Sequence, residues 1–338
     1  MSPLLAVDAG GTSSRAVILD EHGRCVGYGR AGGGNPISSG PQRAAAAVVA
    51  ATRDALEHAA AALEGPRSPR ALDLTLGLIA MAGARTYSST EWITSELEPF
   101  GLLGTVVIES DLLAAFCSAG PELDGYAIVA GTGACAVRVQ EGRVAACADG
   151  LGWLLGDAGS GYWIGHAAVL AAVSALDGRA PGTALVPLVL TALGIRETAE
   201  RTADGRPQAL ADAVDRLYAM RPIQLAEFAP LAFTAAEQGD TIAAHILGEA
   251  QRSIVETLAA VSDPAVHGPA VLAGGVLARF DELPSQIAAS QRALGHEPDV
   301  RRVQDGIVGA AVLALRAADV PVDDTVFDTI ARSLAALR

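Results

Sequence analysis

Residues 4–19 read LLAVDAGGTSSRAVIL, and residues 126–139 read YAIVAGTGACAVRV. Each stretch is an apolar strand, a turn containing glycine and threonine, and a second apolar strand. In neither does a helical pattern follow the glycines, whereas the dinucleotide-binding fingerprint needs its glycine turn to open a helix. Backbone amides at a hairpin tip can bind an anion instead. The sequence therefore predicts an internal repeat whose two hairpins face each other and hold a nucleoside triphosphate.

The remaining patterns place strands and helices around these two hairpins. Apolar runs predict strands over 25–32, 71–80, 104–110, 143–149 and 269–277. The run at 104–110 is expected to be buried. Helical spacing predicts helices over 41–63 (ending near Gly65-Pro66), 88–98, from 111, and from 305 to the C-terminus, and almost throughout 162–262. This alternation indicates an α/β protein with a helical insertion.

Composition and charge exclude several classes of protein. Of 338 residues, 51% are hydrophobic and 18% are charged, which allows a large core and two domains. A net charge of −14 argues against nucleic acid, because the phosphate backbone requires a basic face. All 24 basic residues are arginines. The chain therefore has neither the lysine of a Walker A loop nor a lysine for a Schiff base.

The chain carries no pattern for export or for a membrane. Its first residues lack the basic region of a signal peptide, and no eighteen consecutive residues are apolar. The four cysteines form no C-x-x-C pair, so we expect buried free thiols rather than a disulfide framework or a zinc site. They are Cys25, Cys117, Cys135 and Cys147. We expect a cytoplasmic protein.

The hairpin tips are candidate phosphate sites. In the first, amides and hydroxyls would contact the terminal phosphates, and Asp8 would lie near Mg²⁺; the alternative is a tight turn that uses glycine and aspartate for backbone freedom. The same alternative holds for the second hairpin. The candidate phosphate-binding residues are Gly10, Gly11, Thr12 and Ser13 in the first hairpin, and Gly131, Thr132 and Gly133 in the second.

Asp111 is the candidate general base. It follows a predicted strand, where a carboxylate could accept a proton from an attacking hydroxyl. The alternative is a helix N-cap or first-turn residue. Glu109 alternates to the other side of the strand. Gly274 and Gly275 end another strand, where they could form a flat floor for adenine or a close helix–strand contact.

Seven motifs in order resemble the sugar kinases of the actin-like ATPase superfamily, and more narrowly the N-acetylglucosamine kinase and BadF/BadG-type group. They are VDAGGTSSR, GGGNP, VIESDLLAA, YAIVAGTGACA, GWLLGDAGSGYWIG, VLAGGVL and DGIVGAA. The resemblance implies two actin-like (ribonuclease H-like) domains, residues 1–112 and 113–338, with the nucleotide and sugar between them. It implies Asp111 as the base, Gly274 and Gly275 at adenosine, and Asn35 and Asp157 at the sugar. The iron–sulfur activators of the group need a close cysteine pair, which this sequence lacks.

One motif departs from the group. N-acetylglucosamine kinases typically read G-G-W-G here, whereas this chain has Leu151 at the tryptophan position, Asp149 before it and Trp153 after it. The carboxylate of Asp149 would bind the 2-ammonium group of glucosamine more strongly than the 2-acetamido group of N-acetylglucosamine. The alternative is that Asp149 is a turn residue. The candidate sugar-binding residues are thus Asn35, Asp111, Asp149, Gly150, Gly152 and Asp157.

The resemblance therefore predicts an ATP-dependent, Mg²⁺-requiring glucosamine kinase of the actinobacterial type that forms a homodimer. An N-acetylglucosamine kinase is the alternative. A non-catalytic sugar-responsive regulator is a remote one, because such proteins usually lose the base or carry a DNA-binding extension.

Overall fold

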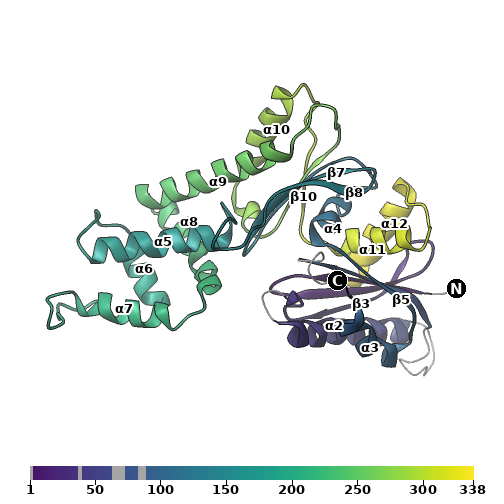
Figure 1. Cartoon of the computed structure of the whole chain (residues 1–338), viewed down its shortest axis with the longest axis horizontal. Coiled ribbons are helices and arrows are strands. Elements are labelled where there is room, and N and C mark those ends of the chain that lie inside the picture. Colours follow the sequence, from purple (N-terminus) through teal and green to yellow (C-terminus); the bar gives the residue numbers. More distant parts are fainter. Residues whose placement is uncertain (1–2, 37–39, 63–72, 83–88) are drawn as a thin grey trace.

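The computed structural model describes residues 3–36, 40–62, 73–82 and 89–338, and its core is two five-stranded mixed sheets (Figure 1). The first sheet has the order β3-β2-β1-β4-β5. Strands β1, β2 and β3 form an antiparallel meander, and β4 and β5 continue parallel to β1. Their bounds are β1 Leu4–Ala9, β2 Ser14–Leu19, β3 Cys25–Ala31, β4 Leu74–Met81 and β5 Leu102–Ser110.

The second sheet repeats this topology. Its order is β10-β9-β6-β7-β8, again with an antiparallel meander (β6, β7, β8) and two parallel strands beside its first member. The bounds are β6 Gly125–Ala130, β7 Ala134–Gln140, β8 Arg143–Asp149, β9 Ala270–Ala273 and β10 Val300–Val303. The predicted internal repeat and the absence of a helix after either glycine turn are confirmed.

Two strands differ from the sequence-based expectation. Strand β10 was not predicted, because its four residues include Arg301 and Arg302 and show no apolar run. Arg301 is accommodated by ion pairs with Glu122 and Asp299, both at 2.7 Å. Strand β5 was expected to be buried, but it is the edge strand of its sheet and most of its residues are exposed or half-buried. An edge strand has a neighbour on one side only.

An alanine-rich helix, α2 (Pro41–Ala62), covers one face of the first sheet, and the glycines of β3 allow its close approach. A Cβ added at Gly27 would lie 2.1 Å from the Ala55 carbonyl oxygen, and one at Gly29 would lie 2.1 Å from that of Ala51. The predicted end of this helix at Gly65-Pro66 lies outside the described residues. Helices α3 (Glu91–Leu97) and η2 (Glu98–Phe100) precede β5; α3 lies within the predicted range 88–98, and η2 extends two residues beyond it.

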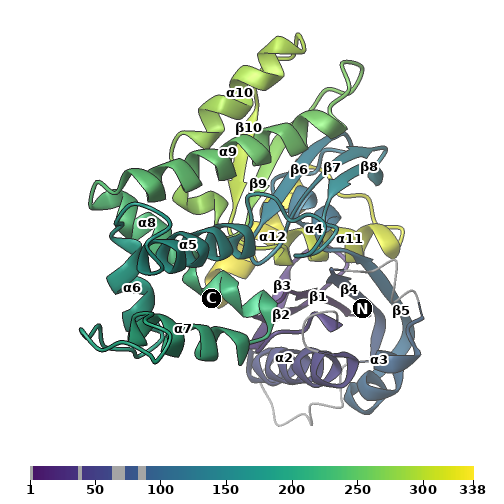
Figure 2. The same cartoon turned by 60° about the vertical axis from the view of Figure 1, so that its left-hand side comes forward.

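Three helices lie between the two sheets: α4 (Asp111–Cys117), α11 (Ile307–Ala317) and α12 (Asp324–Leu337) (Figure 2). Helix α4 packs mainly on the second sheet and also contacts β1, β4 and β5 of the first, whereas α11 and α12 pack on the first. They belong to one apolar cluster that draws on both sheets. The two halves therefore share a core. The predicted domain boundary between residues 112 and 113 stays a prediction, because it is not marked by a break in this shared packing.

The helical insertion extends away from the sheets (Figure 1). Helix α9 (Thr241–Val261) packs against β7 and β8 and connects the insertion to the second sheet. No helix among the described residues is long and apolar enough to span a bilayer. The other helices of this half are α5 Gly161–Leu176, α6 Leu185–Ala192, α7 Gln208–Tyr218, η3 Pro222–Phe228, α8 Ala229–Glu237, η4 Leu277–Arg279 and α10 Leu283–Ala293.

Replacing Gly29 by alanine should destabilise the protein, because the new methyl group would overlap the α2 backbone at Ala51. Overpacking of this kind typically costs about 1–3 kcal/mol, which should lower the thermal unfolding midpoint by several degrees. The matched control is Gly77→Ala in β4, where the added Cβ meets Leu102 at an ordinary 3.5 Å. Equal midpoints for the two variants would contradict the proposed close packing of α2 on β3.

Candidate active site

Asp8, the penultimate residue of β1, is a buried carboxylate that links the two halves of the protein. Its side chain is paired with Arg15 at 3.3 Å, and it accepts a hydrogen bond from the Gly306 amide at 3.1 Å. Arg15 also pairs with Asp305 at 3.2 Å. Burial raises the pKa of Asp8 to about 6, although Arg15 lowers it, and the nearby carboxylates of Asp305 and Asp111 add to the rise.

The first hairpin leaves two amides at its tip for a ligand. Gly10 donates its amide to the Ser13 carbonyl at 3.0 Å, so that amide closes the turn. Gly11 and Thr12 are exposed, and their amides donate to no acceptor among the described residues. The predicted phosphate contacts of this hairpin are thus available at Gly11 and Thr12, while Gly10 and the buried Ser13 shape the turn.

The GGGNP segment docks on the first hairpin. The Gly34 amide donates to the Gly10 carbonyl at 3.0 Å, and a Cβ at Gly34 would lie 2.2 Å from Ser14 Oγ. Asn35 follows directly and is half-buried. The structure therefore places Asn35 beside the first hairpin, close to where the phosphates of a bound ligand are expected.

The second hairpin is built in the same way and is fixed to helix α5. Gly131 donates its amide to Gly133 within the turn, at 2.9 Å. The carbonyls of Gly131 and Thr132 accept hydrogen bonds from the first amides of α5, at 2.7 and 3.1 Å. The amides of Thr132 and Gly133 donate to no acceptor among the described residues, so this tip also leaves two donors for an anion.

Asp157 supports the second hairpin from below. It is buried, and its Oδ1 atom accepts from the Ala134 amide at 3.1 Å. A Cβ at Gly133 would lie 2.9 Å from the same carboxylate, so a larger residue at this position would displace the Asp157 side chain. Burial raises the pKa of Asp157. The structure gives this residue a local role in addition to the predicted contact with a sugar.

Asp149 organises the loop that joins β8 to α5. Its carboxylate accepts hydrogen bonds from the amides of Asp157 (2.6 Å) and Ala158 (2.8 Å). A Cβ at Gly156 would lie 2.1 Å from Asp149 Oδ1, which explains that glycine. Asp149 and Asp157 both have positive φ angles, 62° and 56°. Asp149 therefore has the turn role that the sequence left open, and these hydrogen bonds use part of the acceptor capacity of its carboxylate.

The same loop exposes apolar side chains. Leu151 is 67% exposed, and Trp153 is 41% exposed and packs on Tyr162 with ring centroids 5.8 Å apart. Gly150 and Gly152 have φ angles of 70° and 85°, a conformation that glycine adopts without strain. Gly150 lies against Cys135, whereas a Cβ at Gly152 would meet nothing within 4 Å.

Asp111 is the first residue of α4, and Ser110 is the N-cap, because Ser110 Oγ accepts from the Leu112 amide at 3.2 Å. Of the two alternatives that the sequence left open, Asp111 is not the N-cap but is a first-turn residue, and its carboxylate is within hydrogen-bonding reach of the Leu112 amide. Burial raises its pKa to about 6. Its charge also raises the pKa values of Asp8 on the first sheet and Cys135 on the second. Asp111 thus lies where the two sheets meet.

The two glycines that follow β9, Gly274 and Gly275, have different surroundings. Gly274 has a φ angle of 102°, and a Cβ there would lie 2.3 Å from the Ala130 carbonyl oxygen. Glycine is needed at position 274 because the ends of β9 and β6 are in close contact, not because of the helix–strand contact that the sequence suggested. Gly275 is exposed, and a Cβ there would meet nothing within 4 Å. Only Gly275 is thus open to a ligand such as adenosine.

The acidic residues fit Mg²⁺ only as part of a nucleotide complex. No group of three or more histidine, cysteine or acidic residues in the described ranges could hold a metal ion. Asp8 already pairs with Arg15 through Oδ2. Mg²⁺ commonly keeps several waters and binds through one or two carboxylates together with phosphates. Asp8 can serve as such a partner, through water.

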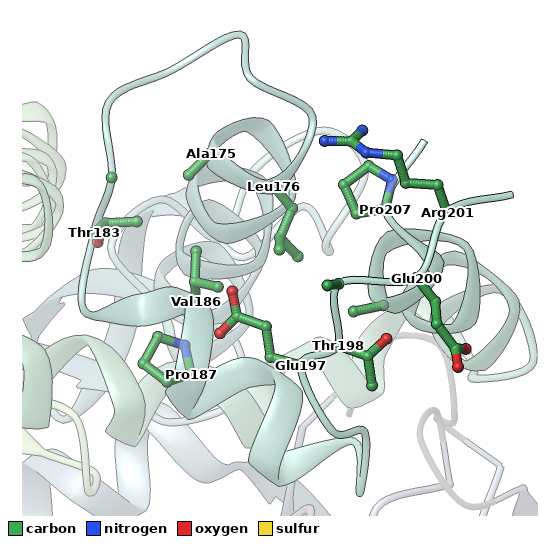
Figure 3. Close-up of a pocket in the computed structure, with 13 residues that line it drawn as sticks. Ala175, Leu176, Thr183, Val186, Pro187, Glu197, Thr198, Glu200, Arg201 and Pro207 are labelled. Atoms are coloured by element: carbon green, nitrogen blue, oxygen red, sulfur yellow. The ribbon is translucent and has the colours of Figure 1, made fainter. Parts of the chain in front are cut away.

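A separate surface cavity of about 460 Å³ lies in the helical insertion (Figure 3). Its walls come from the end of α5, the start of α6 and residues 197–209. The Glu197 side chain points toward Val186, whereas Glu200 points away. None of the predicted site residues lines it, so it is not part of the candidate active site.

Sequence reasoning missed Arg15, Asp305 and Gly306. Arg15 is the direct cross-strand partner of Asp8 in the β1–β2 register, and it is the only charged residue in an otherwise apolar strand. A single charged side chain in such a strand is a sign of a buried charged partner that sequence analysis could have used. Asp305 gave none, because its contact with Arg15 joins residues 290 positions apart.

The architecture matches known actin-like proteins. A putative N-acetylglucosamine kinase of Chromobacterium violaceum superposes with a TM-score of 0.70 at 24% identity, covering 93% of this chain and 99% of that one. A glucokinase of the ROK family from Streptomyces griseus, solved with glucose and AMPPNP, superposes with a TM-score of 0.52 at 20% identity, covering 93% and 100%. These likenesses confirm the predicted fold class.

Sequence relatives include two amino-sugar kinases, and a family profile covers most of the chain. Glucosamine kinase GspK of Vibrio cholerae is 28% identical over 190 residues, which are 56% of this chain and 61% of that protein. N-acetyl-D-glucosamine kinase of Dictyostelium discoideum is 24% identical over 326 residues, or 92% and 97%. The BadF/BadG/BcrA/BcrD ATPase family matches residues 5–314, and the chain therefore belongs to this family.

Proposed function

We propose that this chain is an ATP-dependent hexosamine kinase that phosphorylates the 6-hydroxyl of D-glucosamine. The observation that carries the proposal is the position of Asp111. It is a carboxylate with a raised pKa that directly follows β5 and lies near Asp8 and Cys135, which flank the two glycine hairpins whose tips carry unengaged amides. Kinase relatives of both amino sugars are consistent with this substrate class.

In the proposed reaction, Asp111 accepts the proton of the 6-hydroxyl as the oxygen attacks the γ-phosphorus of ATP, the bond between that phosphorus and the β–γ bridging oxygen breaks, and ADP leaves. A pKa of about 6 keeps the carboxylate ionised at neutral pH while making it more basic than an ordinary aspartate. Phosphoryl transfer depends chiefly on positioning and charge stabilisation. The protein would supply these through the backbone of both hairpins.

The amides of Gly11, Thr12, Thr132 and Gly133 would bind the phosphate oxygens, and Gly275 would lie beneath the adenosine. Four backbone donors can serve an anion where no lysine is present. Mg²⁺, when bound to ATP, neutralises phosphate charge. Asp8 would orient the waters around that ion.

Asn35 and the loop from Asp149 to Asp157 would surround the sugar. Asp149 Oδ2 accepts one amide hydrogen bond in the described structure, and a carboxylate oxygen can accept more than one. That leaves acceptor capacity for the 2-ammonium group of glucosamine. Gly150 and Gly152 keep the approach to this carboxylate free of side chains.

N-acetyl-D-glucosamine is the second candidate substrate. Three backbone amides, those of Leu151, Asp157 and Ala158, already donate to the Asp149 carboxylate. This favours a sugar with a neutral 2-substituent over one with an ammonium group. The relative that covers 92% of this chain is named for that sugar. We rank glucosamine first because Leu151 replaces the tryptophan expected beside an acetamide.

Assembly, location and subtype are further proposals. We propose a homodimer in the cytoplasm, of the actinobacterial type of glucosamine kinase. The non-catalytic regulator is the remote alternative, and the presence of a buried carboxylate with a raised pKa at Asp111 speaks against it.

An ADP-release assay over a panel of sugars tests the proposed function. Glucosamine should give the highest kcat/KM among glucosamine, N-acetylglucosamine, glucose, mannose and N-acetylmannosamine, because only glucosamine brings an ammonium to Asp149. A higher kcat/KM for N-acetylglucosamine would establish the second candidate. Absence of sugar-dependent ADP release with every sugar would contradict the kinase itself.

Replacing Asp111 by asparagine should lower kcat by about 100-fold or more, the usual contribution of a general base. KM values should change little, since the size of the side chain is retained. The control is Glu109→Gln on the same strand; burial raises the pKa of Glu109 as well, but we give it no role. Equal kcat values for the two variants would remove Asp111 from the mechanism.

The pH profile provides a second readout for Asp111. Because its pKa is raised to about 6, the carboxyl group is neutral below that pH and cannot accept a proton. In the wild type, kcat/KM should fall as the pH drops through about 6, and Asp8, with a pKa also near 6, can steepen the fall. The Glu109→Gln variant should show the same fall in kcat/KM as the pH drops through about 6.

Asp149→Asn should lower kcat/KM for glucosamine about 10- to 150-fold, because losing a charge-assisted hydrogen bond costs about 1.5–3 kcal/mol. Disturbance of the loop would affect all sugars alike, so glucose serves as the internal control. The ratio of kcat/KM for glucosamine to that for glucose should therefore narrow. An unchanged ratio would show that Asp149 acts only through the loop.

A further inference from the structure

Two cysteines that are twelve residues apart in the chain meet on neighbouring strands. Cys135 on β7 and Cys147 on β8 have their Sγ atoms 3.2 Å apart, close enough for one thiol to donate to the other. In the antiparallel register Cys147 lies opposite Val137, so the two cysteines are diagonal neighbours on one face. The sequence-based expectation of four buried thiols is wrong for Cys147, which is exposed.

The two thiols differ in their surroundings. Cys147 lies on the edge strand of the second sheet, where solvent reaches it. Cys135 is half-buried beneath it, and burial together with the neighbouring Cys147 raises the pKa of its thiol. Cys147 is thus the sulfur that a reagent in solution meets first, and Cys135 is held within reach of it.

The pair lies directly beneath the candidate sugar loop. Cys135 is the cross-strand partner of Asp149, and a Cβ added at Gly150 would lie 3.0 Å from Cys135 Sγ. The residue before Cys135, Ala134, accepts from the Gly150 amide at 2.9 Å and donates to Asp157 at 3.1 Å. Any movement of the cysteines is therefore transmitted to this loop.

We propose that Cys135 and Cys147 form a reversible intramolecular disulfide on exposure to a hydroperoxide, and that this disulfide displaces the loop at Asp149 and lowers the activity of the site. The first part stands on the thiol geometry alone. The second part rests on the proposed kinase function.

The oxidation balances with hydrogen peroxide as the oxidant. The Cys147 thiolate attacks one peroxide oxygen, the O–O bond breaks, and a sulfenic acid and one water form after proton uptake. The Cys135 thiol then attacks the Cys147 sulfur, the S–O bond breaks, and the hydroxyl leaves as a second water with the thiol proton. Two electrons pass from the two sulfurs to the peroxide, and a dithiol reductant reverses the reaction.

The bond requires a movement that this edge can make. A disulfide holds its sulfurs about 2 Å apart, so they must approach by roughly 1 Å. Strand β8 pairs with β7 on one side only, and four of its seven residues are exposed. Asp149 ends this strand two residues after Cys147, so drawing β8 toward β7 shifts the aspartate and its loop.

The chemical test uses the reduced full-length protein treated with hydrogen peroxide, alkylated and analysed by mass spectrometry without reductant. Two of the four thiols should escape alkylation, and one linked peptide pair should contain Cys135 and Cys147. Cys25→Ala, at a buried thiol remote from the pair, should still form the link. Finding Cys147 oxidised or linked to another molecule while Cys135 stays alkylatable would overturn the proposal.

The functional test measures sugar phosphorylation before oxidation, after oxidation and after dithiothreitol. Oxidised wild type should show kcat/KM for sugar reduced about tenfold or more, because a misplacement of about 1 Å can cost roughly 100-fold. Dithiothreitol should restore it, and Cys147→Ser should not respond. A complete disulfide with unchanged kinetics would overturn the coupling to the site. No activity in the reduced protein would instead reject the proposed kinase, while the linked peptide would still establish the disulfide.

Discussion

The arrangement of the two halves depends on the burial of one carboxylate. Asp8 is only 7% exposed, and a buried charge must be paired and hydrogen-bonded to be tolerated. Arg15 provides the charge from the same hairpin, and the Gly306 amide provides a hydrogen bond from the other half of the chain. Arg15 and the C-terminal Arg338 both pair with Asp305. The end of β1 is thereby fixed to the segment that follows β10.

This fixed point sets the position of Asp111 through helix packing. Helix α11 begins directly after Gly306 and crosses α4 at very short range, since a Cβ at Gly309 would lie 1.8 Å from the Ala114 carbonyl oxygen. The Gly309 amide also donates to Ser118 Oγ at 2.8 Å. Asp111 is the first residue of α4. A rigid contact between two helices therefore holds the proposed base at a set place relative to Asp8.

The glycines near the site fall into two physical classes. Gly274 faces the Ala130 carbonyl oxygen closer than a Cβ allows, whereas Gly133 and Gly156 face the carboxylates of Asp157 and Asp149, which an added Cβ would displace. Gly275 faces open space, and Gly11 is exposed at its hairpin tip. A small residue in the second class leaves room for something outside the chain. Open space alone does not mark a ligand site, because surface glycines elsewhere, such as Gly178 and Gly205, are equally open; the proposed ligand at the first hairpin and beside Gly275 rests on the unengaged amides and the position of these glycines.

The sequence by itself determined the repeated hairpins, the α/β class, the helical insertion and Asp111 as a strand-end carboxylate. Each of these follows from local periodicity and turn chemistry, which short stretches encode. Only the tertiary structure revealed β10, the Asp8–Arg15–Gly306 contact, the loop role of Asp149 and the meeting of Cys135 with Cys147. These depend on which strands pair and in which register, and a register brings together side chains whose own neighbours in the sequence give no sign of the contact.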